Sequence, residues 1–345
     1  MNGQTFTMNP RMHLAAALIV LALQSLGVAQ NDFSYTGEAQ RDIPAVAWSD
    51  EAKASAPGGR VRVAFYNIEN FNDAEGDGPE RTRALAEEQA RGAAALIEEI
   101  APDILVLSEL ENETALALLN QALTRPYPFG WVTKLGDGTT DRPKLNFGLL
   151  SRLKPVDLLE LDFGPLQGRG RPTRGSLRAT FDLGDNHRLV VYGVHLKSNY
   201  GHRPRNIAQR KHALRIVASD AQALATDASV RWEKILVGDM NVDPEAREFE
   251  GDASLSPLRG WSDLWRGRPL QDRITVPTRY GIPDREFPPV TFDRIFAAGD
   301  ATNAPWRVGE AGVLQQGVHT KVATTLPGVD GHISDHYPIW VDLHR

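Results

Sequence analysis

The sequence predicts an α+β fold in which two mixed β-sheets pack face to face, with helices on their outer faces. Two observations support this class. Stretches with helical spacing separate some of the apolar, strand-like segments, whereas other strand-like segments follow one another with no helix between them. In addition, residues 60–345 contain no internal repeat and no convincing boundary, so we expect them to form one domain.

The composition is that of a globular protein. The chain has 345 residues, of which 41% are hydrophobic and 24% are charged. It has no cysteine, which excludes disulfides and thiolate chemistry. The formal net charge of −6 makes the whole chain a poor indiscriminate binder of polyanions, although net charge does not exclude a local basic site.

Residues 1–29 read as a secretory signal rather than as part of the fold. Arg11 is the one charged residue in this segment, and residues 14–23 form an apolar run that is too short to span a bilayer. Small residues at 27–29 fit a signal peptidase site. We therefore expect cleavage after Ala29 and a secreted or periplasmic protein with no membrane span after signal removal. Removal of this segment takes away Arg11 and leaves 37 of the 38 basic residues against 44 acidic ones, so the mature net charge is −7.

The first half of the mature chain alternates strands with helices. Residues 30–59 are rich in Asp, Ser, Ala and Pro, and we interpret them as an arm or linker. Residues 60–67 alternate like a half-buried strand. A helix opened by Pro79 follows, with small and apolar side chains at helical spacing up to Ile100. Residues 104–107 then form a buried strand.

The later segments extend this pattern. A short helix is predicted at 114–123 and a longer one at 203–225. The remaining strands are predicted at 129–133, 146–151, 177–183, 189–195, 235–237, 290–297 and 337–343. Residues 251–289 are rich in Pro, Arg and Trp without a clear period, so we expect loops there.

The stretch 234–244 carries the clearest chemical signal. Residues 235–237 form a buried strand that Gly238 ends. Asp239 and Asn241 stand two positions apart, so on a strand-like continuation both side chains point to the same face. A carboxylate and an amide at the end of a strand can hold a hard cation and orient a water or a phosphate oxygen. Taken alone, the stretch also fits an ordinary Asx turn.

Polar side chains recur at five further strand ends, in regions where packing does not require them. The complete series is Asn67 with Glu69, Glu109, His195, Asp239 with Asn241, Asp293, and Asp335 with His336. Singly, each of these is most simply a cap or turn residue. Together they form an ordered series in which each member follows or sits in an apolar run.

In these stretches the sequence resembles the endonuclease/exonuclease/phosphatase superfamily, whose members share the deoxyribonuclease-I-like fold. The matching stretches are AFYNIENF around Asn67, DILVLSELEN around Glu109, GVHLKS around His195, VGDMNVDP around Asp239, TFDRIF around Asp293 and ISDHYPIW around His336. They occur in the family's order and span essentially all of residues 60–345. The resemblance implies a four-layered α/β sandwich, closest to the secreted bacterial nucleases of the superfamily.

The resemblance also implies a metal site. Glu109 corresponds to the principal metal carboxylate, with Asn67 beside it and Asp335 as a further ligand. The expected ion is Mg²⁺, with Mn²⁺ or Ca²⁺ as alternatives. Elementary electrostatics agrees, because converging Glu109, Asp239, Asp293 and Asp335 carboxylates would raise one another's pKa values unless a dication compensates them.

The resemblance assigns catalytic roles as well. Asp335 is expected to orient His336, which takes a proton from water. Asp293 is expected to position His195, which meets the scissile phosphate. The inner polar pair of the site is Asp239 and Asn241, the latter also a substrate contact. Phosphoryl transfer needs only such positioning, charge neutralisation and an in-line water.

Two stretches without acidic residues are expected to supply phosphate contacts. They contain Arg169, Arg171, Arg174 and Arg178 in one case, and Lys197, Arg203, Arg205, Arg210, Lys211 and Arg215 in the other. Phosphate binding is favoured for Arg174 and Lys197, which adjoin predicted strands near the site. For the more distant cations, a solvated loop or helix face explains the pattern equally well.

The sequence departs from the family pattern at three places. Ser108 stands where a Gln usually precedes the metal carboxylate, and Glu111 stands where deoxyribonuclease itself tends to carry the arginine that enters the minor groove. Thr291 and Phe292 replace the Trp-Cys of inositol phosphatases. The second departure argues against reading the groove of duplex DNA, and the third against an inositol phosphatase.

The sequence therefore predicts a secreted, divalent-metal-dependent phosphodiesterase, as a monomer, with nucleic acid as its substrate. One alternative is a phosphatase or phospholipid phosphodiesterase on the same fold. The other is a binding module that has kept the fold without catalysis, against which the complete set of six stretches argues.

Overall fold

The computed structural model describes most of the chain from residue 58 onward, and the described residues lie within one compact unit, Gly37–Arg345. They are residues 40–42, 45–47, 58–75, 81–134, 145–164, 166, 174–224, 229–281, 285–299, 306–319, 322 and 325–345. The predicted secretory signal lies outside them, as do Pro79, Arg169 and Arg171.

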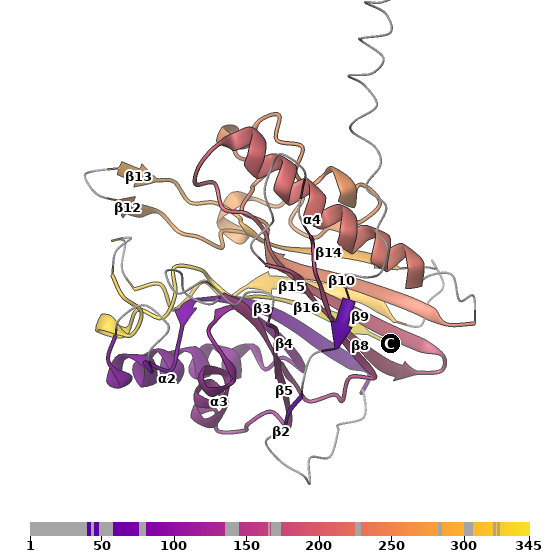
Figure 1. Cartoon of the computed structure of the whole chain (residues 1–345), viewed down its shortest axis with the longest axis horizontal. Helices are drawn as coiled ribbons and strands as arrows, with labels where there is room; N and C mark the ends of the chain where they lie inside the picture. The colour runs from indigo at the N-terminus through magenta and orange to yellow at the C-terminus, as the bar shows by residue number, and fades with distance from the viewer. Residues whose placement is uncertain are drawn as a thin grey trace, which may run out of the picture. The chain divides into compact units, whose positions relative to one another are not determined.

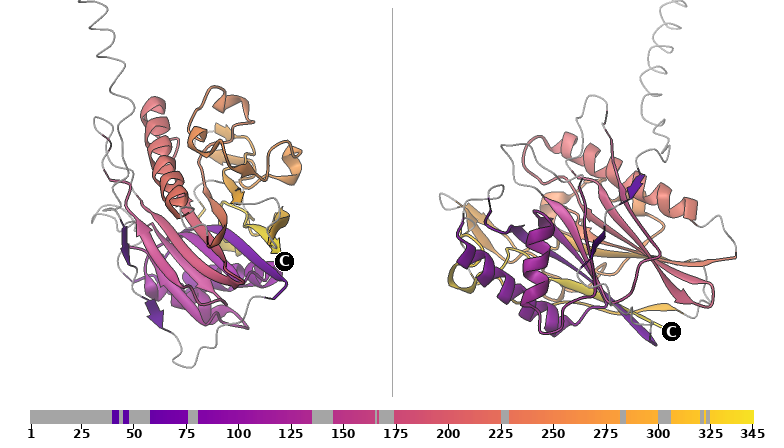
Figure 2. Two further views of the ribbon diagram at one scale, coloured as in Figure 1. Left: turned by 90° about the vertical axis from the view of Figure 1, so that its right-hand side faces the viewer. Right: turned by 60° about the horizontal axis from the view of Figure 1, so that its bottom comes forward.

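Two seven-stranded mixed sheets pack face to face, and helices cover their outer faces, which confirms the predicted fold class (Figures 1 and 2). The first sheet contains, in spatial order, β15 (Arg307–Val313), β16 (Ile339–His344), β3 (Arg60–Phe71), β4 (Ile104–Leu110), β6 (Asn146–Ser151), β5 (Phe129–Val132) and β2 (Ala45–Ala47). The second contains β1 (Gln40–Asp42), β7 (Asp157–Leu161), β8 (Ser176–Gly184), β9 (His187–His195), β10 (Arg231–Asp239), β14 (Asp293–Gly299) and β11 (Ser262–Asp263).

The alternation of side chains along β3 explains how the first sheet joins two cores. Val61, Val63 and Phe65 belong to the core between the sheets. Ala64 and Tyr66 belong to the second core, between this sheet and the helices. Because successive side chains of a strand point to opposite faces, one strand can serve both layers. The strand is consequently apolar on both sides along most of its length.

Two helices cover the first sheet. Helix α2 (Arg83–Ile100) begins after Thr82, whose hydroxyl accepts a hydrogen bond from the Leu85 backbone N–H at 3.3 Å. Helix α3 (Glu113–Ala122) is capped in the same way by Asn112. Such caps satisfy N–H groups that have no partner within the helix. The predicted helices are thus present, with α2 capped a few residues after the predicted start.

Helix α4 (Arg203–Leu224) covers the second sheet and is attached to it by polar contacts. Asp220 of this helix accepts hydrogen bonds from Arg178 Nη1 at 2.9 Å and from Tyr192 Oη at 2.6 Å. Arg178 is buried and also pairs with Asp157. Arg178 therefore joins α4 to the sheet, and the phosphate contact that its basic stretch suggested is not available to it.

The segment after β10 is mostly loop, as predicted, but it contains a hairpin of β12 (Arg279–Gly281) and β13 (Arg285–Phe287). This hairpin projects from the body of the fold (Figure 1). The sequence analysis missed these two strands, the longer strands β7 and β15, and the short strands β1, β2 and β11. Strand β14 begins at Asp293 rather than at 290. Within the described ranges, no helix is both long enough and apolar enough to cross a bilayer.

Candidate active site

The register of three neighbouring strands brings polar side chains into one row. Asp239 at the end of β10 is the Cα partner of His195 on β9 and of Asp293 on β14. Residues in register share a face of the sheet, and here it is the inner face, to which Val237 also points. Gly238 is required just before Asp239, because a Cβ there would lie 1.9 Å from the Val194 carbonyl oxygen.

The opposite sheet contributes Asn67 and Glu109. Asn67 continues the inward face of β3 that Phe65 occupies. Strict alternation would turn Glu109 to the helix side of β4 together with Leu107, but Glu109 has a φ of 64° and the pairing with β6 is irregular at this point. This break in the strand lets its carboxylate reach Asn67, whose Nδ2 lies 3.3 Å from Glu109 Oε1. The predicted pair is therefore brought together by a local backbone irregularity.

Asn67 connects the two sheets at the site. Its Nδ2 also donates to Asp239 Oδ2 at 3.3 Å, across the gap between β3 and β10. His195 Nε2 lies 3.4 Å from the same Asp239 oxygen and 3.8 Å from Glu109 Oε1. Two carboxylates, an amide and an imidazole therefore converge on one small region where the two sheets meet.

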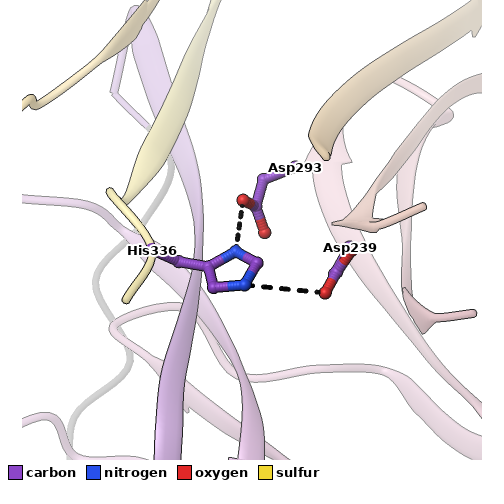
Figure 3. Close-up of side chains that lie close together, drawn as sticks. All are labelled: Asp239, Asp293 and His336. Carbon is purple, nitrogen blue, oxygen red and sulfur yellow. Dashed lines mark hydrogen bonds and ion pairs between the residues drawn. The ribbon is translucent and has the colours of Figure 1, made fainter. Parts of the chain in front are cut away.

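His336 lies between two carboxylates, as Figure 3 shows. Its Nδ1 lies 2.6 Å from Asp293 Oδ2, and its Nε2 lies 3.9 Å from Asp239 Oδ2. A short contact of an imidazole Nδ1–H with a buried carboxylate fixes the orientation and tautomer of the ring. His336 and Asp293 thus form a dyad in which Nε2 faces the other polar groups of the site.

This arrangement corrects the two pairings implied by the family resemblance. Asp293 was expected to position His195, and Asp335 was expected to orient His336. In the structure Asp293 contacts His336, while Asp335 Oδ1 lies 3.8 Å from His336 Nε2 and Asp335 Oδ2 forms an ion pair with Arg279. The reason is the strand order: β10 lies between β9 and β14, so Asp239 stands between His195 and Asp293, whereas His336 reaches Asp293 directly.

The electrostatic environment separates the two histidines. Burial lowers the pKa of His195 well below its ordinary value, and the positive charges of Arg174 and His336 lower it further. Burial also disfavours the charged form of His336, but the Asp293, Asp239 and Glu109 carboxylates outweigh burial and raise its pKa to about 9. Opposite displacements of two neighbouring titratable groups are typical of acid–base sites.

The pKa of Asp239 shows that the converging carboxylates disfavour one another's charged forms. Burial raises the pKa of Asp239 to about 7; His336 opposes this rise, whereas Asp293 and Glu109 add to it. Asp293 Oδ1 is buried and has no hydrogen-bond partner among the described residues. Ligand atoms of Asp239, Asp293 and His336 lie within 4.8 Å of one another, which is close enough to hold a metal ion. An unsatisfied carboxylate oxygen in such a cluster suits a dication.

The other predicted site residues surround this centre. Arg174 Nη1 donates to the His195 carbonyl oxygen at 3.3 Å, so its side chain lies beside the site. Asn241 donates through its backbone N–H to Asp239 Oδ1 at 2.8 Å and through its side chain to the Leu196 carbonyl. Lys197 Nζ lies near the Ser198 hydroxyl and the Tyr200 carbonyl, within its own loop. All three therefore lie within or next to the loops that follow β9 and β10.

The second basic stretch is only partly free to meet a ligand. Arg210 is buried, donates to Asp252 and Ser254, and supports the loop after β9 through the Lys197 carbonyl. It is therefore a structural cation. Arg203, Arg205 and Arg215 are exposed on α4, and Arg203 Nη2 donates to the Glu250 carbonyl at 3.0 Å.

Sequence reasoning missed several residues that hold the site in place. Thr275 Oγ1 accepts the Phe292 and Asp293 backbone N–H groups, each at 3.0 Å, and the Thr275 carbonyl accepts the Tyr337 N–H at 2.7 Å. One residue of an aperiodic segment thus positions both members of the Asp293–His336 dyad. The sequence carries no sign of this, because a threonine in a loop has many equivalent explanations.

Two further residues support the site, and one of them, Gln89, left a detectable sign in the sequence. Ser334, two residues before His336, accepts the His336 N–H and donates to the Asn67 carbonyl at 2.6 Å. Gln89 is fully buried in α2 and donates to the Ile68 and Ile333 carbonyls. A glutamine at a position where helical spacing requires an apolar residue is such a sign.

A buried ion-pair network joins the turn after β10 to the segment before β14. Asp243 is fully buried and accepts hydrogen bonds from Arg273 at 2.8 Å, from Arg294 at 3.2 Å and from the Thr291 N–H at 3.1 Å. Breaking such a network leaves an uncompensated buried charge, which costs several kcal/mol, about 3–5 in measured cases. The network therefore fixes the relative position of the strand ends that carry Asp239 and Asp293.

Comparison with known proteins agrees with this fold. The profile of the Endonuclease/Exonuclease/phosphatase family matches residues 64–336. A search of the curated proteins found no match. Similar solved structures include D. rerio TDP2 complexed with single strand DNA product, at 19% identity and a TM-score of 0.57, covering 83% of this chain and 99% of that chain. Sphingomyelinase C from Streptomyces griseocarneus is similar at 19% identity and a TM-score of 0.57, covering 82% of this chain and 99% of that chain. An endonuclease/exonuclease/phosphatase from Beutenbergia cavernae is similar at 20% identity and a TM-score of 0.52, covering 83% of this chain and 71% of that chain.

Proposed function

The chain belongs to the endonuclease/exonuclease/phosphatase family. We propose that it is a divalent-metal-dependent phosphodiesterase that hydrolyses nucleic acid. The observation that carries the proposal is the His336–Asp293 dyad, whose Nε2 faces Asp239 within a cluster of carboxylates. A binding module that had lost catalysis would have no need for a buried imidazole and carboxylates in this costly arrangement.

The cofactor proposed is Mg²⁺, with Mn²⁺ or Ca²⁺ as alternatives. Glu109, Asp239 and the unsatisfied Oδ1 of Asp293 offer the carboxylate oxygens that hard cations prefer. When bound, the dication would neutralise charge that develops on the phosphate in the transition state. Asn67 keeps the Glu109 and Asp239 carboxylates close together through its amide.

The protein's own groups supply proton transfer and positioning. Asp293 holds the Nδ1 proton of His336, which leaves Nε2 to accept a proton from the water that attacks phosphorus in line. Compensation of the neighbouring carboxylate charges would bring the high pKa of His336 down toward neutrality, where a base is most effective. His195, neutral because of burial, can donate from Nε2 to a phosphate oxygen.

Cations near the site favour nucleic acid over a small phosphate ester. Arg174 lies beside His195, Lys197 lies in the next loop, and exposed Arg203 and Arg205 follow on α4. Such a series suits a chain of phosphates that runs past the site. The similarity in fold to TDP2 bound to single strand DNA product is consistent with this proposal, whereas the equal TM-score of sphingomyelinase C makes a phospholipid phosphodiesterase the rival.

The protein acts outside the cytoplasm, after export and removal of residues 1–29. The support for this part of the proposal is the arrangement of Arg11, the apolar run 14–23 and the small residues 27–29. A monomer is sufficient for the chemistry, because every group of the site comes from one chain.

A substrate panel tests the proposal. The mature protein is offered single-stranded oligonucleotides, plasmid DNA, inositol phosphates and sphingomyelin vesicles, each with Mg²⁺ and with EDTA. We expect cleavage of nucleic acid, abolished by EDTA and by His336→Ala. Phosphate release from inositol phosphates or cleavage of sphingomyelin, with no cleavage of nucleic acid, would refute the assignment.

Salt dependence provides a second test. Binding to single strands should weaken with salt with a log–log slope of about −0.7 per phosphate contact. Arg174→Ala and Lys197→Ala should each reduce this slope by about one contact. Arg215→Ala is the matched control, because Arg215 is a cation exposed on α4 but is not one of the two cations for which phosphate binding is favoured. Equal slopes for all three variants would contradict the predicted contacts.

A further inference from the structure

A pocket of about 640 Å³ opens beside the catalytic groups. Three aromatic side chains line it, Phe249, Phe287 and Phe292, together with Val276 and Val290. The pocket also reaches Asp335, the residue that precedes His336 in the chain. A ligand that extends from a phosphate at the active site could therefore enter this pocket without leaving the protein surface.

The aromatic side chains come from separate parts of the chain. Phe249 follows β10, Phe292 precedes β14, and the two rings meet edge to face with centroids 5.8 Å apart. Phe287 belongs to β13 of the projecting hairpin and is 40% exposed. Aromatic side chains at the wall of a concave site are well suited to hold a flat, apolar face.

Arg279 supplies hydrogen-bond donors at the same pocket. Its Nη1 pairs with Asp335, but its Nε and Nη2 are buried and have no hydrogen-bond partner among the described residues. Arg279 as a whole is only 5% exposed. Buried guanidinium donors without partners are costly, so a ligand with acceptor atoms would remove an unfavourable feature of the unbound protein.

The acidic side chains of the lining do not exclude a ligand attached to phosphate. Asp252 is fully paired, since its carboxylate accepts Arg210 Nη2 at 2.9 Å. Asp335 is paired with Arg279. Glu248 and Glu286 are exposed, where water screens their charge. The interior of the pocket is therefore mainly apolar, and Arg279, which carries two unsatisfied donors, forms part of its wall.

We propose that this aromatic pocket binds an unpaired nucleobase of the substrate, next to the scissile phosphate, and so selects single-stranded nucleic acid; the inference rests on the proposed nuclease function. A nucleobase combines a flat π-face for the phenylalanines with ring and carbonyl acceptors for Arg279. In a duplex the same base is stacked and paired, and reaching the pocket would require it to be flipped out. Glu111, where an arginine would enter the minor groove, is consistent with this preference.

The test compares Phe287→Ala with Tyr280→Ala. Both residues lie on the β12–β13 hairpin and are exposed to almost the same extent, 40% and 42%, but only Phe287 lines the pocket. Three substrates are used with Mg²⁺: a single-stranded oligonucleotide, the same strand in a duplex, and an abasic oligomer with the same phosphates but no bases. Circular dichroism confirms that both variants fold.

The expected result has two parts. The wild-type protein should cleave the single strand at least about 10-fold more efficiently, in kcat/KM, than the duplex or the abasic oligomer. Phe287→Ala should lose about 5- to 100-fold on the single strand but nothing on the abasic oligomer, while Tyr280→Ala should match the wild type on both.

The outcomes that contradict the inference are distinguishable from failure of the proposed function. If all three substrates are cleaved equally and Phe287→Ala has no effect, the pocket does not hold a base, although the protein is still a nuclease. If sphingomyelin vesicles are hydrolysed and no oligomer is cleaved, the pocket serves a lipid headgroup or chain, and both the function and the inference are wrong.

Discussion

Replacement of Asp293 by Asn tests the central feature of the site, the contact between Asp293 Oδ2 and His336 Nδ1 at 2.6 Å. The substitution keeps the size of the side chain and removes its charge. The Asn amide can also present N–H groups to Nδ1, which would favour the tautomer with the proton on Nε2. We therefore expect a fall in kcat of about 10²–10⁴, with the fold intact.

The magnitude of the electrostatic effect follows from the pKa of His336. Burial alone would lower it, yet the carboxylates, with Asp293 the strongest, raise it to about 9. A rise from 6.5 to about 9 corresponds to about 3 kcal/mol in favour of the charged imidazolium, at 1.36 kcal/mol for each tenfold change. Asp293→Asn should bring the pKa of His336 toward or below 6.5, because burial then meets less opposition.

The same shift predicts a dependence of stability on pH. In the metal-free protein the folded state retains the His336 proton up to about pH 9, whereas the unfolded chain releases it near 6.5. This stabilisation is therefore complete below pH 6.5 and is lost as the pH rises to 9. The free energy of unfolding should fall by about 2 kcal/mol between pH 7 and 9, and Asp293→Asn should lack this slope.

Two measurements check these expectations. Histidine ring resonances in NMR spectra, with the His336 signal identified by its absence in His336→Gln, report the pKa directly. Urea unfolding in EDTA at pH 7, 8 and 9 reports the stability slope. Asp335→Asn is the control, because Asp335 is partly exposed and lies 3.8 Å from Nε2. If Asp335→Asn lowers the pKa of His336 more than Asp293→Asn does, the dyad has been assigned wrongly.

Three further predictions concern support, metal and export. Thr275→Ala should lower kcat by about 10- to 100-fold, because the hydroxyl that receives the Phe292 and Asp293 N–H groups is lost, whereas Thr275→Ser should retain activity in the same assay. Glu109→Gln should shift the Mg²⁺ concentration needed for half-maximal activity upward; an unchanged Mg²⁺ titration would remove Glu109 from the metal site. Mass spectrometry of the exported protein should find an N-terminus at or near Gln30, and an intact N-terminus on an active cytosolic protein would contradict the signal assignment.

The fold and the location of the site could be predicted because both depend on local patterns. Alternation along β3 and helical spacing in α2 are visible in the residues themselves. Polar residues at the ends of apolar runs also stand out, and strands that run in the same direction bring their ends to the same edge of a sheet. His195 and Asp239 end the parallel strands β9 and β10, whereas Asp293 begins the antiparallel strand β14, and this pairing brings all three to the same edge of the sheet.

The partners within the site could not be predicted, because they depend on register and side-chain direction across the sheets. Nothing in the spacing of Asp293, Asp335 and His336 states which carboxylate reaches Nδ1. Arg279 gave no signal, since its role depends on a hairpin in an aperiodic segment. The structural role of Arg178 was also missed. Its stretch of sequence contains no acidic residue, yet in the fold it pairs with a buried carboxylate from a distant part of the chain, Asp220.

The backbone of the site decides which substitutions will be informative. Glu69, Asn70, Glu109 and Asn241 all have φ near 50–64°, a conformation that is strained for side chains other than glycine by about 1–3 kcal/mol each. The polar groups of the site offset this strain themselves. Glu109 Oε2 accepts the Asn70 N–H at 3.0 Å, and Asn67 Oδ1 accepts the Glu69 N–H at 3.2 Å.

The Asn241 turn follows the same rule, since its N–H donates to Asp239 Oδ1 at 2.8 Å. A carboxylate that contacts the reacting groups with one oxygen therefore holds a strained turn with the other. Alanine at Glu109 or Asp239 would release the turn and remove the site together, so a loss of activity would not identify a chemical role. Isosteric amides keep an acceptor for the turn and remove the charge, which makes them the informative substitutions for this site.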